Sequence, residues 1–391
     1  MRNQEGFKSA DALVIGGGVI GLSIARSLAK RGMKRVTLVE RSQTLGTEAS
    51  HAAAGMIAAQ AEADQTDAFL ELACASRELY PRFAAELSEE SGTDVELERS
   101  GTLYLALTDE DEAEIEQRFR WQQRAGLMVE KLSADEALRL EPHVTPHVRA
   151  ALRFALDVQV ENRRLVAALT TSITEKYGVD LLIETNVESL HIARGKVAGV
   201  QTSHGALSAP IVVLATGAWT SLIECRSDTG AIFPHILIEP VRGQMLSFAA
   251  QPRLTQHIIY SPRGYIVPRL DGRLLAGSTT EHAGYDKRVT CNGLQQIAQQ
   301  ALEIAPCIGD LPFMDAWAGL RPRAPDGLPV IGECAEARGL YYATGHYRNG
   351  IMLAPITGEL LADAIVAHVQ SPLLRAFSPN RFQPIRANQG I

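Results

Sequence analysis

Three glycines near the start of the chain have the spacing of a phosphate-binding turn. Gly16, Gly18 and Gly21 form a G-x-G-x-x-G motif directly after the apolar run Ala12–Ile15. In such a motif the first glycine permits a tight turn, the second lets the backbone approach a pyrophosphate, and the third lets the next helix pack on the strand. Glu40 lies 24 residues after Gly16, near the roughly 20 expected for an acid that binds a ribose hydroxyl. We therefore predict a dinucleotide site, because a glycine-rich turn without a ligand leaves the position of Glu40 unexplained.

No set of side chains in the sequence has the pattern of acid–base or nucleophilic catalysis. The motifs contain neither a Ser-His-Asp set nor a pair of carboxylates. His346, beside a second glycine-bounded segment near the C-terminus, is either a base or a structural residue, and we favour the structural role. A bound cofactor can carry the chemistry instead, while the protein orients the substrate and stabilises charge.

The elements around the glycine motif have the pattern of a nucleotide-binding sheet. Ala12–Ile15 and residues 35–40 are short apolar runs, typical of strands buried on both faces. Residues 211–214 form a third such run that stops at a glycine turn, and we expect it to return to the same sheet. Residues 48–56 are rich in small side chains and leave the carboxyl end of the second strand, where nucleotide ligands bind. An alanine-rich helix start is the alternative for this segment.

Apolar periodicity predicts the remaining elements. The predicted helices are residues 67–90, a helix after 109–116, and residues 162–177, 292–304 and 351–366. The predicted strands are residues 101–107, 151–160, the strand-rich stretch 240–278, an apolar strand from 313 that Arg321 follows, and residues 340–344. We expect residues 179–184, 187–192 and 197–202 to form one small antiparallel sheet. The chain contains no internal repeat or low-complexity linker.

Composition excludes several classes of protein. The 391 residues are 46% hydrophobic and 21% charged, as in a globular protein of two domains. A net charge of −7 without a basic run argues against nucleic-acid binding. We find no signal region and expect no apolar stretch near the roughly 18 residues of a membrane span. The five cysteines are odd in number and form no C-x-x-C pair, which predicts a cytoplasmic protein without disulfides or a metal site.

Five segments together resemble the FAD-dependent amine and amino-acid oxidases of the D-amino acid oxidase family. They are residues 52–56, 265–269, 317–322, 326–332 and 345–351. Within this family the chain is most similar to the bacterial glycine oxidases of the thiamine-biosynthesis type. The resemblance covers nearly the whole chain.

The family fold implied by this resemblance is α/β with two domains. A discontinuous Rossmann-like FAD-binding domain is expected over residues 1–90, 155–235 and 320–391. A substrate-binding domain with a large antiparallel sheet is expected over residues 91–154 and 236–319.

The resemblance also implies which residues hold FAD. Besides the three glycines, those expected at the ADP half are Val19, Ile20, Glu40, Arg41 and, through its backbone at the adenine, Val187. Those expected at the pyrophosphate and flavin are Ser50, Ala54, Gly55 and Met56. Those expected at the second glycine-bounded segment, around the isoalloxazine, are His346, Tyr347, Arg348, Asn349, Gly350, Ile351 and Met352. The helix that begins near Ile351 would direct its positive end toward the flavin.

Three residues are expected at the substrate. Arg321 matches the family position that binds the substrate carboxylate, which suits the bidentate fork of a guanidinium; a buried structural ion pair is the alternative. Tyr265 matches a tyrosine that hydrogen-bonds the same carboxylate, although a core tyrosine is also consistent with its strand. Arg348 matches a position whose backbone carbonyl accepts from the substrate amine.

Two features depart from the wider family. Some relatives attach flavin through a cysteine near the substrate arginine, but residues 315–319 contain none. FAD is therefore expected to be non-covalent, with Cys334 as the nearest alternative anchor. Arg263, between Tyr260 and Tyr265, is expected to alter access to the site or substrate preference.

The activity implied by the family is oxidative deamination of glycine, sarcosine and small D-amino acids. The expected products are an imine or glyoxylate, ammonia and hydrogen peroxide, with the imine serving thiazole formation. The expected partners are a small amino acid and molecular oxygen, and the family suggests a homotetramer. Two alternatives stay open: an FAD-dependent D-amino-acid dehydrogenase with a quinone acceptor, and a non-catalytic flavin-binding protein.

Overall fold

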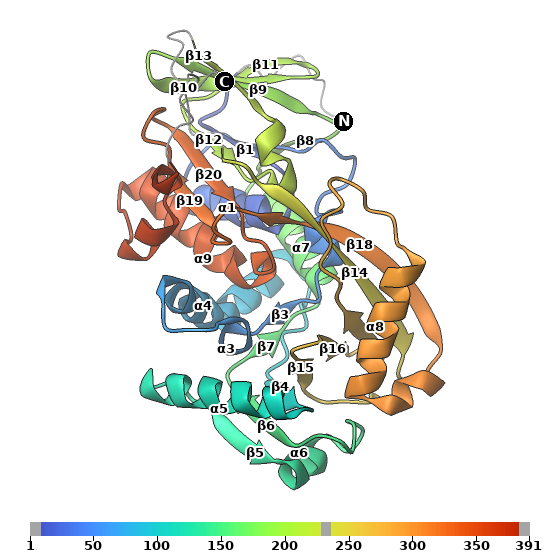
Figure 1. The fold of residues 1–391 in the computed structure, drawn as a ribbon. Helices are drawn as coiled ribbons and strands as arrows, with labels where there is room; N and C mark the ends of the chain where they lie inside the picture. The colour runs from blue at the N-terminus through green and yellow to red at the C-terminus, as the bar shows by residue number, and fades with distance from the viewer. Residues whose placement is uncertain (1–8, 228–235, 383–391) are drawn as a thin grey trace, which may run out of the picture.

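A six-stranded sheet forms the centre of the protein in a computed structural model that describes residues 9–227 and 236–382 (Figure 1). Its strand order is β19-β20-β12-β1-β2-β8. These strands are β1 (Ala12–Ile15), β2 (Val36–Val39), β8 (Asp180–Leu182), β12 (Val212–Leu214), β19 (Val330–Glu333) and β20 (Leu340–Thr344). All neighbours run parallel except β19 and β20. The α/β class and the return of residues 211–214 to the nucleotide sheet are confirmed.

One strand prediction is wrong in its partner. Residues 179–184 were expected in the small antiparallel sheet, but β8 pairs in parallel with β2, with Asp180 opposite Thr37. The small sheet instead has the order β11-β10-β9-β13. Its strands are β9 (Val187–Ala193), β10 (Lys196–Thr202), β11 (Gly205–Ser208) and β13 (Glu224–Ser227). Because β8 is a three-residue edge strand, only half buried, its periodicity indicates a strand without indicating its neighbour.

Alternate residues of β1 enter two different cores. Ala12 and Val14 pack with the helices on one face of the central sheet. Leu13 and Ile15 pack on the other face, with residues of the small sheet. The sheet is therefore buried on both sides, as its continuous apolar sequence predicts for parallel strands.

The helices of the described residues range in length from four residues in α2 and α3 to 24 in α4. They are α1 (Val19–Lys30), α2 (Ala49–Ala52), α3 (Ala59–Glu62), α4 (Ala68–Ser91), α5 (Asp109–Arg124), α6 (Ala134–Leu140), α7 (Asn162–Thr171), α8 (Cys291–Ile304) and α9 (Gly350–Ala362). π-Helical turns continue α7 over Ser172–Lys176 and α9 over Asp363–Ala367. Shorter 3₁₀ turns are Gly217–Leu222, Pro306–Asp310, Pro372–Phe377 and Pro379–Arg381.

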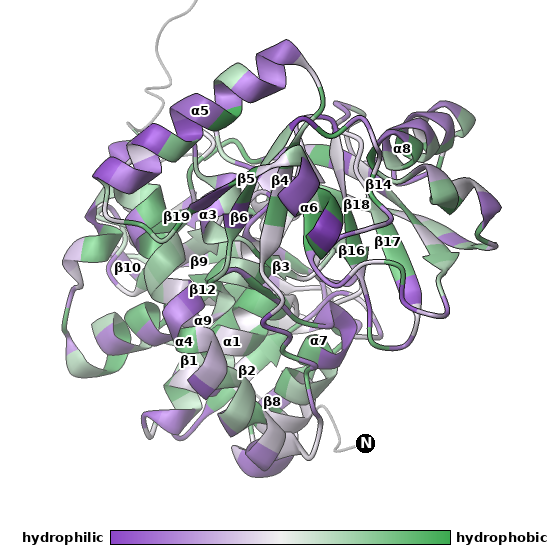
Figure 2. Cartoon of the chain, turned by 90° about the horizontal axis from the view of Figure 1, so that it is seen from below, coloured by the Kyte–Doolittle hydropathy of each residue, from purple (hydrophilic) through white to green (hydrophobic). Residues whose placement is uncertain are grey.

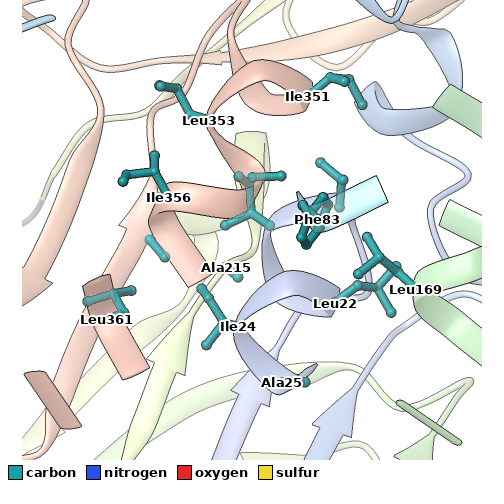
Figure 3. Close-up of a cluster of buried hydrophobic side chains, with 14 of the residues drawn as sticks. Leu22, Ile24, Ala25, Phe83, Leu169, Ala215, Ile351, Leu353, Ile356 and Leu361 are labelled. Atoms are coloured by element: carbon teal, nitrogen blue, oxygen red, sulfur yellow. The ribbon is translucent and has the colours of Figure 1, made fainter. Parts of the chain in front are cut away.

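Helix α9 lies in the core against α1 and α4 (Figure 3). Pro355 has no N–H, so it leaves the carbonyl of Ile351 without its helical partner. The hydroxyl of Tyr80, a buried residue of α4, donates to this carbonyl. Ser76 of α4 donates to the next carbonyl, that of Met352, at 2.6 Å. Side chains of α4 thus bond two carbonyls in the first turn of α9 and tie that turn to α4.

The prediction that no apolar stretch approaches the length of a membrane span is wrong for one segment. Within the described ranges, Gly350–Ala367 meets the length and composition of a span, with a mean hydropathy of 1.6. Its apolar side chains pack in the core between α1 and α4. A core helix that is apolar on all sides meets the same composition test as a membrane helix.

A second, eight-stranded sheet has the order β18-β14-β17-β16-β15-β4-β6-β5 (Figure 1). Its strands are β4 (Thr102–Ala106), β5 (Glu130–Ser133), β6 (Ala150–Phe154), β14 (Glu239–Ala249), β15 (Ile258–Ser261), β16 (Gly264–Pro268), β17 (Arg273–Gly277) and β18 (Phe313–Arg323). All neighbours are antiparallel except β15 and β4. This confirms the large, mostly antiparallel sheet, and β3 (Met56–Ile57) and β7 (Val158–Gln159) form a separate ribbon beside it.

The edges of the second sheet are polar or exposed. Helix α5 presents a largely hydrophilic surface (Figure 2), and β18 begins with the exposed side chains Phe313 and Met314.

Arg321 was expected after an apolar strand, but β18 continues through it to Arg323. The strand therefore fixes the backbone of Arg321 on both sides.

Candidate functional site

A cavity of about 610 Å³ lies between the two large sheets. The turns after β1, β2 and β12, the first turn of α9 and residues of β14, β16 and β18 line it. Of the predicted site residues, those that line it are Gly16, Gly18, Val19, Ile20, Glu40, Arg41, Ser50, Ala54, Gly55, Met56, Val187, Tyr265, Arg321, His346, Tyr347, Arg348, Asn349, Gly350, Ile351 and Met352. Gly21 is the predicted residue outside the lining.

The glycine turn has the geometry that a pyrophosphate needs. Gly16 has φ of +108°, and an added Cβ would lie 2.5 Å from the carbonyl oxygen of Ala215. Gly21 packs instead of lining the cavity, since its Cβ would lie 1.9 Å from the oxygen of Gly16. Gly18 is the N-cap of α1 and provides no side-chain cap. The N–H of Val19, the first residue of α1, donates to Ser50 Oγ at 3.0 Å, and Gly18, Val19 and Ile20 line the cavity at this helix start, where a phosphate would bind.

The acid after β2 is held by the backbone beside the cavity. The two carboxylate oxygens of Glu40 accept from Gly17 N–H at 2.7 Å and from Ser42 N–H at 2.8 Å. Its neighbour Arg41 pairs with Glu48 at 2.8 Å. These bonds fix the Glu40 carboxylate at the end of β2, where a ribose hydroxyl would meet it.

The first turn of α9 forms another wall of the cavity. Its N-cap, Asn349, makes no side-chain cap, and the turn contains no acidic residue. The N-terminal end of the helix dipole is therefore uncompensated at the cavity, which favours an electron-rich group there. His346 is buried, with Nε2 3.1 Å from Thr357 Oγ1. Burial lowers the pKa of His346 to about 3, so it is a poor base near neutral pH, which favours the structural interpretation.

Arg269 supports the alanine-rich wall of the cavity, and the sequence did not predict it as a site residue. It is buried, and its guanidinium donates to the carbonyls of Ala54 and Val160, each at 2.7 Å. Desolvation lowers its pKa to about 10, so it stays charged at neutral pH. Arg269 directly follows β16 and thereby ties the second sheet to residues 53–56, which follow α2 and form part of the cavity wall.

Arg321 reaches the cavity with its charge unpaired. Its guanidinium donates to the carbonyl of Thr279 at 2.9 Å and to Ser278 Oγ at 2.7 Å. Gly243 makes room for it, since a Cβ there would lie 2.2–2.3 Å from the guanidinium atoms. Within the described part of the chain, no carboxylate lies within ion-pair distance of Arg321. Desolvation lowers its pKa; the structural ion pair that was the alternative is thus absent from the described residues.

Tyr265 lies in β16 and lines the same end of the cavity. It is 6% exposed, and its hydroxyl is 3.4 Å from the sulfur of Met245, a weak acceptor. The hydroxyl is therefore available for a stronger partner beside Arg321.

Arg348 is paired with a carboxylate that sequence reasoning missed. Glu62, the last residue of α3, lies 3.6 Å from Arg348 Nε and accepts from Tyr260 Oη at 3.3 Å. The charge of Glu62 is the main cause that raises the pKa of Arg348. Glu62 also lines the cavity. No local motif predicts Glu62 as a site residue, because its partner Arg348 lies 286 residues away in the sequence.

Arg263 does not occupy the position expected of it. Its guanidinium binds Asp111, the N3 residue of α5, and lies 3.5 Å from Glu303 of α8. It is absent from the cavity lining. The expectation that it alters access is unsupported, because two acidic partners outside the cavity hold it.

Together these features define an enzyme of the dinucleotide-cofactor type, with the cation Arg321 at one end of its cavity. A family profile described as FAD dependent oxidoreductase, DAO, matches residues 11–364. The chain belongs to this family, and its cofactor is FAD. The glycine turn, the start of α1 at the cavity and the start of α9, which has no side-chain cap, fit such a cofactor.

Individual relatives extend over nearly the whole chain. Glycine oxidase of Geobacillus kaustophilus is 36% identical over 358 residues, covering 91% of this chain and 92% of that protein. The crystal structure of glycine oxidase from the same organism superposes with a TM-score of 0.88, covering 96% of this chain and 99% of the other at 35% identity. The bifunctional protein ThiO/ThiG of Synechocystis is 34% identical over 379 residues, covering 96% of this chain and 54% of that longer protein.

Proposed function

We propose that this protein is an FAD-dependent glycine oxidase. The observation that carries the proposal is Arg321, a partly buried guanidinium at the cavity with no acidic partner in the described chain. A buried cation without a partner is unfavourable unless a ligand supplies the charge. An amino-acid carboxylate matches its two-pronged geometry. Similarity to glycine oxidases over more than nine-tenths of the chain supports glycine as the substrate.

The residues at the Arg321 end of the cavity bind different groups of the substrate. Arg321 binds the carboxylate, Tyr265 adds a hydrogen bond to it, and the backbone carbonyl of Arg348 accepts from the amine. FAD held by the glycine turn and the start of α9 would supply the redox chemistry, namely acceptance of a hydride from the α-carbon and transfer of the electron pair to oxygen. Glycine, oxygen and water are thereby converted to glyoxylate, ammonia and hydrogen peroxide. The protein contributes orientation of the α-carbon and exclusion of water.

Product analysis under air tests the proposal. We expect one hydrogen peroxide and one glyoxylate for each glycine consumed. An anaerobic activity that reduces a quinone or dye, without peroxide under air, would replace the proposal with a dehydrogenase. Bound FAD that no amine reduces would replace it with a non-catalytic flavin protein.

The wider biological setting follows from the same relatives. We propose that the imine serves thiazole formation in thiamine biosynthesis, in keeping with the ThiO/ThiG relatives.

We also propose that the protein forms a homotetramer, and light scattering measures this oligomeric state directly. A cytoplasmic location is proposed because all five cysteines are free thiols. The two discontinuous domains expected from the sequence are kept as a proposal, with the six-stranded sheet in one and most of the eight-stranded sheet in the other.

A further inference from the structure

The segment from Ser278 to Lys287, which we call the strap, connects β17 to α8 and contacts both ends of the cavity. Its first residues, Ser278 and Thr279, accept from the guanidinium of Arg321, as described above. Its last residues lie against Glu48 and Trp219, which line the opposite, ADP end of the cavity. The strap therefore starts at β17 of the second sheet and reaches the turns that follow β2 and β12.

A chain of charges joins the strap to the turn after β2. Lys287 Nζ lies 2.8 Å from one oxygen of Glu48, and Arg41 Nη2 lies 2.8 Å from the other. Arg41 in turn lies over the ring of Trp219, 3.7 Å from the ring centroid. Arg41, Glu48 and Trp219 all line the cavity, whereas Lys287 does not. Lys287 thus supports lining residues from behind.

Tyr285 supports the same tryptophan from the strap. Its ring lies 5.9 Å from that of Trp219 at 36°, and its hydroxyl donates to the carbonyl of Ala218 at 3.1 Å. Tyr285 is 42% exposed, so burial in a core does not explain its position. The tyrosine instead holds the 3₁₀ turn Gly217–Leu222, four of whose residues, including Ala218 and Trp219, line the cavity.

The strap is anchored in its middle, so its far end is held in place. Arg242 of β14, whose side chain is 8% exposed, pairs with Glu281 at 2.5 Å and with Asp286 at 3.4 Å. It also donates to the carbonyl of Arg288 at 3.2 Å. A buried guanidinium with two acidic partners fixes the segment geometrically. Tyr285 and Lys287 consequently reach the nucleotide side from a rigid base.

We propose that Tyr285 and Lys287 form a clasp that retains FAD by holding Arg41 and Trp219 against its ADP half. The proposal rests on FAD occupying this cavity, and it does not depend on which amine is the substrate. Because the clasp spans from the second sheet to the nucleotide sheet, it adds to retention without touching the cofactor. Its loss should therefore appear as faster release of FAD.

Release of FAD from the purified holoenzyme tests the clasp. Flavin fluorescence after dilution gives the release rate, and titration of the apoprotein with FAD gives the Kd. We expect Lys287→Ala to raise the Kd roughly two- to five-fold at low salt, an effect that shrinks in high salt. Tyr285→Ala should raise it by roughly three- to ten-fold through loss of the ring contact. Tyr285→Phe keeps the ring and should lie between Tyr285→Ala and the unmodified protein.

Arg288→Ala is the matched control. Arg288 is the cation directly after the strap, and its side chain pairs with Asp286 rather than with Glu48 or Trp219. Its Kd for FAD should equal that of the unmodified protein. Unchanged FAD affinity in both Lys287→Ala and Tyr285→Ala would overturn the clasp, as would an equal loss in Arg288→Ala. Unmodified protein that binds no FAD would instead contradict the cofactor site itself.

Discussion

Charge balance decides what the individual residues at the substrate end of the cavity can bind. Arg321 and Arg348 supply two cations there, and Glu62 supplies one anion. Arg348 is partly neutralised by Glu62, while the polar partners of Arg321 are neutral. The net positive charge therefore centres on Arg321, which makes it the residue for a carboxylate.

Removing the Arg321 guanidinium should weaken binding of the substrate and leave the cofactor in place. Truncating one partner of a buried charge pair costs about 2–5 kcal/mol, so Arg321→Ala should raise the KM for glycine by at least roughly 30-fold. Arg321→Lys should restore only part, because an ammonium lacks the planar fork. Steady-state kinetics and the FAD content of each variant measure this. A normal KM in Arg321→Ala with FAD still bound would move the carboxylate site, and Arg348 would be tested next.

Neutralising Glu62 should change the affinities for two ligands in opposite directions. Glycine carries an ammonium that the Glu62 carboxylate attracts, whereas glycolate carries only the carboxylate. Glu62→Gln should therefore raise the KM for glycine and lower the inhibition constant of glycolate, each by about 1 kcal/mol or ~5-fold. Glu110→Gln makes the same change of net charge at an exposed position on α5 and should alter neither value. If both ligands shifted in the same direction in Glu62→Gln, the charge-balance account would be wrong.

At the scale of elements, the turn between β1 and α1 separates glycines that shape the chain from one that makes room for the ligand. Gly16 and Gly21 contact other backbone atoms so closely that a side chain there would displace them. Gly18 has an ordinary φ of −77°, and its added Cβ would meet only Ser50 Oγ, at 3.3 Å. Gly18 is thus the position where a side chain tests ligand binding apart from folding.

Gly18→Val should produce folded protein without flavin, because the side chain would fill the space that the pyrophosphate needs. Flavin absorbance per protein reports cofactor content, and far-UV circular dichroism reports the fold. Normally yellow Gly18→Val protein would mean that the pyrophosphate lies elsewhere.

Contacts between helices on the nucleotide sheet supply a pH-dependent part of stability. Burial alone would raise the pKa of Glu90 in α4, but hydrogen bonds from Arg26, Ser172 and Tyr177 outweigh it and lower the pKa below 4.5. A lowered pKa in the folded state means that the carboxylate stabilises the fold above the unfolded pKa, and that this is lost as pH falls through the folded value.

Glu90→Gln should therefore lower the free energy of unfolding at pH 7 by about 1.5–3 kcal/mol, the range for hydrogen bonds to a charged group. The difference from the unmodified protein should shrink as pH falls below 4.5. Urea unfolding at both pH values measures it. Glu89→Gln, at an exposed neighbouring position, should change stability little. A difference that persists undiminished at acid pH would show that the charge of Glu90 is not its source.

At the scale of the whole molecule, the parts predictable from sequence are those that a local pattern encodes. The strand-turn-helix from Ala12, the return of residues 211–214 and the large antiparallel sheet are all confirmed. The first two have a continuous apolar run or a motif whose meaning does not depend on distant residues, whereas the large antiparallel sheet was expected from the family resemblance. The family motifs likewise placed Arg321 and Tyr265 at the cavity.

The parts that escaped prediction depend on which segments the fold brings together. Glu62 meets Arg348 only because α3 packs near the start of α9, and Gly243 faces Arg321 only because β14 pairs with β18. Arg269 is a buried cation on an apolar strand, which local sequence does not distinguish from a solvated one. The prediction for the edge strand β8 was wrong for the same reason, because its pairing with β2 depends on how the fold brings two distant segments together.

Reduction of the bound flavin by glycine without oxygen tests the central claim most directly. The measurement is the visible flavin absorbance of the holoenzyme during an anaerobic titration with glycine, with sarcosine and small D-amino acids as parallel titrants. We expect glycine to bleach the flavin, and we expect the admission of oxygen to restore its colour with formation of hydrogen peroxide. Flavin that stays oxidised with glycine, sarcosine and small D-amino acids would contradict it.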